Sequence, residues 1–168
     1  MPFPISHQAT LSWNINPEKY KNIFPNNSLE SLKEVVVVEI AKELGRAKGR
    51  DTLIQINVIT FRGGMFRLVN NRNILSPITG GRIEVALTGN RVTVDYYLIF
   101  MQMLVGATLI FISLGLFVSL LVKDLPLGMI GMMAVICIWC FIMNFLIGIN
   151  RFSSFLKKAV ERNINQER

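Results

Sequence analysis

The sequence predicts an α+β cytoplasmic head, with one helix on an antiparallel meander sheet, followed by a two-helix transmembrane hairpin. Two uncharged apolar runs, residues 96–122 and 125–150, lie back to back, and only Lys123 and Asp124 separate them. Each run exceeds the roughly 20 apolar residues that a helix needs to cross a bilayer. Ahead of the runs, one segment has apolar residues at helical spacing and several short segments alternate apolar and polar residues.

The helix of the head is expected after Asn27. The Asn27 side chain and Glu30 make a start that is similar to a capping box, and Gly45 offers a C-cap. Between these positions the apolar residues recur at helical spacing: Leu29, Leu32, Val36, Ile40 and Leu44. Four successive valines at residues 35–38 favour a strand by propensity alone, but the caps and the flanking helix formers favour a helix.

The sheet is expected to consist of short strands with a period of two, separated by glycine and asparagine turns. The expected strands cover residues 10–15, 53–61, 65–69, 82–87 and 91–95. In the second of these strands, Ile54, Ile56 and Val58 are expected to face inward. Because the helix can cover one face of the sheet, a two-layer arrangement follows.

The chain is expected to divide into five parts. These are a cytoplasmic α+β domain at residues 1–95, a first transmembrane helix at 96–122, an extracytoplasmic turn at 123–126, a second transmembrane helix at 127–150 and a basic amphipathic cytoplasmic tail at 151–168. Lys and Arg predominate in the head and in the tail, so the positive-inside bias predicts that both termini face the cytoplasm. The predicted location is the inner (plasma) membrane, with two passes.

Four glycines in the apolar runs offer small surfaces where helices can approach closely: Gly106, Gly115, Gly128 and Gly131. Contact between the two helices of one chain is the favoured interpretation. Contact between chains in an oligomer is the alternative.

The tail has an apolar stripe at helical spacing, formed by Phe152, Phe155, Leu156, Ala159 and Val160. Basic residues occupy the opposite side, so a helix lying on the anionic cytoplasmic leaflet is the favoured interpretation. Docking of the stripe on the sheet of the head is the alternative.

Candidate contacts for an anion or a lipid are the basic residues of the turn after the head helix and of the tail: Arg46, Lys48, Arg50, Arg151, Lys157 and Lys158. A plain solvated surface is the competing interpretation. Arg62, Arg67, Arg72 and Asn73 form a second candidate, and outward arginines on neighbouring strands would favour an anionic ligand. Turn and strand structure alone also accounts for those residues.

An ordered set of short motifs runs from the middle of the head towards the spans: Phe61-Arg62-Gly63, Phe66-Arg67-Leu68, Asn71-Arg72-Asn73, Pro77-Ile78 and Gly81-Arg82-Ile83. Over residues 53–150 the chain resembles a group of small bacterial proteins in which such strands and turns precede two transmembrane helices. The YcxB-like proteins are similar in architecture. This chain departs from the group pattern at residues 74–76 and in its doubled glycines. The resemblance implies the layout and a bacterial inner membrane, and no reaction.

The sequence argues against an enzyme, a metal site and a cofactor. The single histidine, His7, lies near the N-terminus, and no nucleophile has a base at a recognisable spacing. Cys137 and Cys140 have a C-x-x-C spacing but lie within an apolar run, where no further Cys or His completes a set of four ligands. No nucleic acid is expected as a partner.

The leading functional hypothesis is a non-enzymatic membrane protein whose head binds a partner or a ligand. The expected partners are the bilayer and either a second copy of the chain or another membrane protein. One alternative is an oligomeric two-helix effector or pore that the head gates. Another is a module that recognises anionic lipid.

Overall fold

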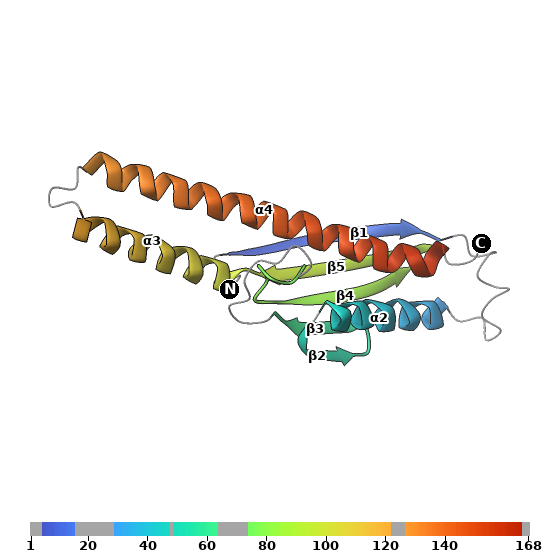
Figure 1. Ribbon diagram of the computed structural model, residues 1–168. Helices are drawn as coiled ribbons and strands as arrows, with labels where there is room; N and C mark the ends of the chain where they lie inside the picture. Colours follow the sequence, from blue (N-terminus) through green and yellow to red (C-terminus); the bar gives the residue numbers. More distant parts are fainter. Residues whose placement is uncertain (1–4, 16–28, 48, 64–73, 122–126, 166–168) are drawn as a thin grey trace.

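The computed structural model describes residues 5–15, 29–47, 49–63, 74–121 and 127–165. Its elements in chain order are β1 (Ser6–Asn14), α2 (Leu29–Arg46), β2 (Arg50–Gln55), β3 (Val58–Arg62), β4 (Gly80–Thr88), β5 (Arg91–Ile99), α3 (Met101–Leu121) and α4 (Leu127–Asn165). The strands and α2 form a head, and the two long apolar helices extend from one end of it (Figure 1). The predicted α+β class is confirmed.

The strands form a five-stranded antiparallel sheet in the order β1-β5-β4-β3-β2. Strands β2 to β5 pair with their neighbours in sequence, which confirms the meander, and β1 adds to β5 at the far edge. The tight turn between β4 and β5 contains Gly89, whose φ of 58° is a conformation that glycine adopts without steric cost.

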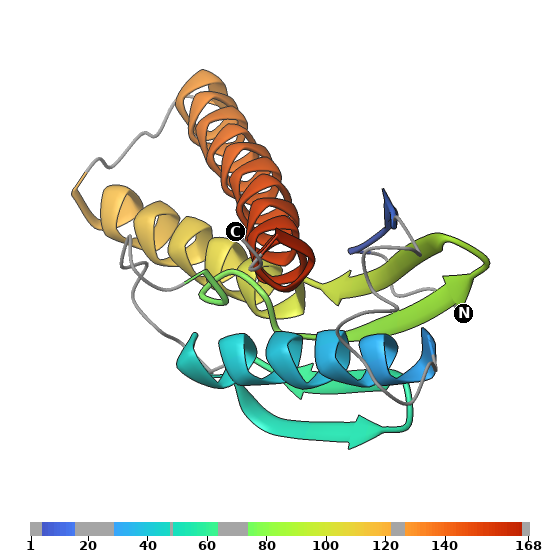
Figure 2. The ribbon, with the colours of Figure 1, turned by 90° about the vertical axis from the view of Figure 1, so that its right-hand side faces the viewer.

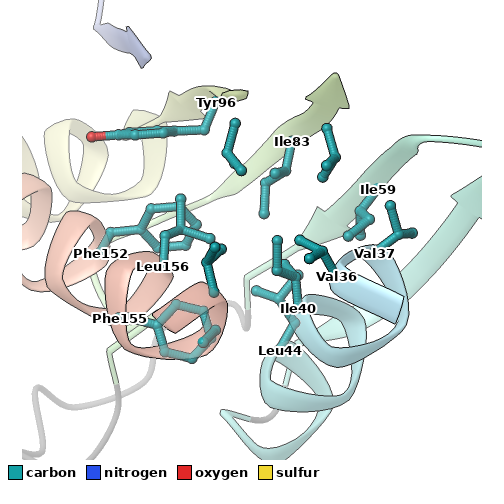
Figure 3. Close-up of a cluster of buried hydrophobic side chains, with 14 of the residues drawn as sticks. Val36, Val37, Ile40, Leu44, Ile59, Ile83, Tyr96, Phe152, Phe155 and Leu156 are labelled. Carbon is teal, nitrogen blue, oxygen red and sulfur yellow. The ribbon is translucent and has the colours of Figure 1, made fainter. Parts of the chain in front are cut away.

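One face of the sheet is covered by two helices, α2 and the C-terminal part of α4 (Figure 2). Alternate residues of the central strands, such as Ile83 and Val94, are fully buried beneath them. Val36, Ile40 and Leu44 of α2 fill the same layer, as their helical spacing predicted (Figure 3). No helix of the described chain covers the other face.

The C-terminal part of α4 belongs to the core of the head, so the prediction of a tail lying on the membrane surface is wrong. The ring centroid of Phe152 lies 5.7 Å from that of Phe61 and 5.6 Å from that of Tyr96. Phe155, Leu156 and the rest of the apolar stripe are buried beside α2 (Figure 3). The reason is that α4 is one unbroken helix, which directs its apolar stripe onto the open apolar face of the sheet.

The single strand expected at residues 53–61 is a hairpin of two strands that turns at Ile56 and Asn57. Ile56 has a φ of 53°, which is unusual for a β-branched residue, so its identity gave no signal of a turn. Ile56 is 87% exposed and Ile54 is 50% exposed, so the inward assignment of both was wrong. The strand and turn expected at residues 65–73 lie outside the described residues.

The first apolar run does not begin as a helix at residue 96. Strand β5 continues to Ile99, with Tyr96 and Leu98 buried in the core, and α3 starts only at Met101. The inward alternation of Tyr96, Leu98 and Phe100 continues the period of the strand. The sequence did not show this period, because residues 96–100 are apolar or aromatic on both faces of the strand.

Helices α3 and α4 are long and apolar enough to cross a membrane by length and composition, and their apolar windows are not buried in the described chain. They meet beside the head, where the rings of Phe100 and Phe145 lie edge to face at 4.7 Å. Gly148 packs there too, because a Cβ on it would lie 3.0 Å from the Pro77 side chain. In contrast, no neighbouring atom comes within 4 Å of a Cβ built at Gly106, Gly115, Gly128 or Gly131, so the described chain makes no close helix contact at these glycines.

A candidate anion-binding site beside the first apolar helix

A hollow of about 580 Å³ lies at the end of the sheet from which α3 starts. Residues of β2, β3, β4, β5 and the first turn of α3 line it, together with the residue after β3 and the residue before β4: Arg50, Asp51, Phe61, Arg62, Gly63, Thr79, Gly80, Gly81, Arg82, Tyr97, Ile99 and Gln102. We call it the basic hollow, because three of these side chains are arginines. The basic hollow therefore lies where the end of the sheet meets the start of an apolar helix.

Strand register brings the three arginines together. Arg50 pairs with Arg62, Arg62 pairs with Gly80, and Gly80 pairs with Ile99, which makes one row across four strands. Arg82 stands two residues along β4 and therefore projects from the same face as this row. Phe61 precedes Arg62 in β3, and Ile83 follows Arg82 in β4. Because Phe61 and Ile83 are buried under the helices, Arg62 and Arg82 project from the uncovered face of the sheet.

Glycines shape the floor of the basic hollow. Gly80 lies between Arg62 and Ile99 in the row, and a Cβ built on it would lie 3.1 Å from the carbonyl oxygen of Phe61. At Gly63 a Cβ would lie 1.7 Å from the carbonyl oxygen of Ile78, so only glycine allows this close approach of backbone. The chain before β4 is thereby held against the end of β3.

Thr79 links this floor to the first apolar helix. Its amide donates to the carbonyl of Ile99 at 2.7 Å, and its carbonyl accepts from the amide of Gly63 at 2.9 Å. Its hydroxyl oxygen accepts a hydrogen bond from the amide of Gln102 at 2.8 Å, which caps the start of α3. The hydroxyl keeps its own proton to donate.

The charges in the basic hollow favour an anion. Arg82 forms an exposed ion pair with Glu84 at 3.1 Å. Arg50 and Arg62 have no ion-pair partner among the described residues, and Asp51 is the acidic residue of the lining. Guanidinium groups donate two parallel hydrogen bonds to carboxylate or phosphate, so this lining suits a phosphate or carboxylate group.

The structure separates the basic residues that the sequence singled out. Arg50 and Arg62 line the basic hollow, whereas Arg46 is paired with Glu43 on α2. Arg151 and Lys158 line a second hollow of about 550 Å³ between α2 and α4, and Lys157 is exposed on α4. Lys48, Arg67, Arg72 and Asn73 lie outside the described residues.

Sequence reasoning did not select Arg82, Thr79, Tyr97 or Gln102 for this site. The signal for Arg82 was present, because an inward Ile83 makes its neighbour project outward from the strand. Tyr97 was not selected, because the strand that carries it was expected to end at Asp95 and the first transmembrane helix to begin at residue 96. Thr79 and Gln102 come together only through the capping contact.

Within the described ranges, no group of three or more His, Cys, Asp or Glu residues is arranged to hold a metal ion. Comparison of the chain with protein-family models, with characterised proteins and with solved structures gives no match. The resemblance to the small bacterial two-helix membrane proteins therefore stays a prediction.

Proposed function

We propose that the chain is a two-span membrane protein that holds its head against the bilayer surface, where the head binds an anionic ligand without catalysing a reaction. The observation that carries this proposal is the position of the basic hollow, which shares Gln102 with the first turn of an apolar helix. The hollow supplies hydrogen-bond donors rather than a paired base and nucleophile, so it suits binding better than catalysis.

Exposed apolar side chains support the membrane part of the proposal. Along α3 and α4 large residues such as Phe117 and Trp139 are about 60% and 63% exposed. In water such a surface would be costly, at roughly 25 cal/mol for each Å² of apolar area. A bilayer removes this cost.

The polar side chains of these helices also suit lipid. Thr108, Ser119 and Asn144 each donate to a carbonyl of their own helix, at 3.0, 2.8 and 2.8 Å. Groups that satisfy their hydrogen bonds within one helix need no water, so they are tolerated in the hydrocarbon region.

The two spans have matching lengths. Contact between Phe100 and Phe145 places residue 145 of α4 level with the start of α3. The part of α4 beyond that contact, residues 127–144, is about 27 Å long, and α3 is about 31 Å long. Both are close to the roughly 30 Å of a hydrocarbon core. Residues 145–150, which were expected in the second span, would then lie at the level of the head.

Cell fractionation and reporter fusions test the membrane part. The full chain is expected to stay in bacterial membranes after an alkaline carbonate wash, and the positive-inside bias predicts that reporters at both ends are active only in the cytoplasm. A chain released by the wash, or a reporter active outside the cell, would contradict the proposal.

Titration tests the ligand part. The full chain in nanodiscs of neutral phosphatidylcholine is expected to bind inorganic phosphate, and Arg62→Gln is expected to weaken binding about tenfold, which is the loss of one charge-assisted hydrogen bond. Equal binding by the variant would contradict the assignment of the site.

A second candidate function is an oligomeric effector or pore. It is favoured by the absence of contacts at Gly106, Gly115, Gly128 and Gly131 in the described chain, which leaves these small surfaces for other copies. Overexpression would then depolarise the membrane, and Gly115→Leu would relieve the effect. A monomeric chain that leaves the membrane potential unchanged would argue against it.

A further inference from the structure

We propose that the ligand of the basic hollow is the phosphate of an anionic phospholipid from the leaflet that holds the head. This inference rests on the proposed function and names the source of its anion. Free phosphate offers the same chemistry, so the two sources have to be separated by experiment.

The level of the hollow in the membrane is the first reason. The side of the hollow nearest α3 includes Ile99 and Gln102, and the apolar window of α3 begins at Met101. The opposite side includes the paired residues Arg82 and Tyr97. Each lies two residues, or about 7 Å, from the Gly80–Ile99 pair along its strand. The headgroup layer extends about 5 to 7 Å beyond the hydrocarbon on each side of a bilayer. If the hydrocarbon region begins at Met101, the arginines therefore stand at the depth of lipid phosphates.

The geometry of the donors is the second reason. Arg50, Arg62 and Gly80 lie in one row on adjacent strands, about 4.8 Å apart. Arg50 and Arg62 are therefore direct neighbours in the lining of the hollow, so that both guanidinium groups can donate to one phosphate group. Arg82 borders the same space from the next row, although Glu84 already shares its charge.

The apolar rim is the third reason. Ile99 lines the mouth of the hollow, and Val105, one turn along α3, is 38% exposed. The phosphate of a lipid can therefore enter the hollow while its acyl chains continue along α3. Tyr97 adds an aromatic ring of the kind that is enriched at membrane interfaces.

Availability is the fourth reason. A lipid is confined to the same surface as the head, so its effective concentration at the hollow exceeds that of a dilute soluble anion. A site of moderate intrinsic affinity is then occupied by lipid.

The test uses the full chain in nanodiscs of phosphatidylcholine that contain a minor fraction of phosphatidylglycerol. After exchange into mild detergent, the lipid that stays bound is identified by native mass spectrometry. The wild-type protein is expected to retain phosphatidylglycerol at least tenfold over its share in the disc. Arg62→Gln is expected to reduce this enrichment several-fold, and the double variant Arg50→Gln/Arg62→Gln to abolish it.

Arg91→Gln is the matched control. Arg91 projects from the same face of the sheet and carries the same charge, but lies at the opposite end of β5, six residues from Tyr97 and about 20 Å from the hollow. It is expected to keep the full enrichment. An equal loss with Arg91→Gln would mean that net charge, and not the hollow, attracts the lipid, and would overturn the inference.

The two proposals can fail separately. If phosphate binds through Arg62 in neutral discs but no anionic lipid is enriched, the lipid assignment is wrong and the anion site stands. If neither the binding of phosphate nor the enrichment of lipid depends on Arg62, both the anion site and the lipid assignment are wrong. Circular dichroism and the thermal transition of each variant should match those of the wild type, so that a folding defect is recognised.

Discussion

At the scale of single residues, glycines decide how closely the segments around the basic hollow pack. Gly63 and Gly81 each face backbone at distances that no Cβ tolerates, 1.7 Å from the Ile78 oxygen and 2.7 Å from the Tyr97 oxygen. The end of the sheet therefore depends on the absence of two side chains.

Gly63→Ala is expected to destabilise the head by more than about 2 kcal/mol, because the added methyl group would displace the backbone of Ile78. Thermal unfolding of the full chain in detergent measures the effect. Gly45→Ala is the matched control: its Cβ would meet nothing within 4 Å in α2, so a gain of about 0.5 to 1 kcal/mol is expected from helix propensity. An unchanged transition for Gly63→Ala would refute the close approach.

At the scale of elements, prediction succeeded where local chemistry agreed with the fold. The period of the apolar residues of α2 was sufficient to locate the helix, although its valines favour a strand. The predicted cap residue Asn27 lies outside the described residues, and Gly45 is not the C-cap, because α2 continues to Arg46. Strands β4 and β5 were found because glycine marks their turn. The β2–β3 turn was missed because isoleucine occupies it, and the end of β5 was missed because both of its faces are apolar.

The candidate site was predicted only in part for a related reason. Arg50 and Arg62 were each selected from the sequence, but in different groups. Their position opposite each other depends on the pairing of β2 with β3 across a turn that the sequence does not signal. Strand register is a tertiary property, and alternation alone does not specify it.

Docking of the end of α4 on the sheet leads to a second prediction. Phe152 is fully buried between Phe61 and Tyr96, so Phe152→Ala is expected to cost about 3 to 5 kcal/mol. Lys157→Ala, on the exposed side of the same helix, should change stability by less than about 0.5 kcal/mol. Chemical unfolding in detergent compares them. A small effect of Phe152→Ala would favour a tail that leaves the head.

At the scale of the whole molecule, α4 joins the region proposed to lie in lipid to the core of the head as one helix of 39 residues. Phe100 alone separates β5 from α3. The head is thus continuous with both apolar helices, and its orientation is set by them.

Insertion of one alanine after Asn150 tests this continuity. It would rotate the stripe of Phe152 by about 100° relative to the Phe145 contact, because an α-helix turns once in 3.6 residues. Unfolding of the head should then occur at least about 5 °C lower, as followed by Trp13 fluorescence in a Trp139→Phe background. The same insertion after residue 165 serves as the control. If both insertions leave the unfolding temperature of the head equally unchanged, α4 is not a rigid continuous helix at Asn150.

The single residue between β5 and α3 has a consequence for how the head meets its ligand. Phe100 is the whole link between β5 and α3, and α4 is unbroken. The described chain therefore has no flexible linker between the head and the apolar helices that would let the head move away from them. Once the helices are embedded, its reach ends at the lipid surface, and any soluble molecule that it recognises has to arrive there.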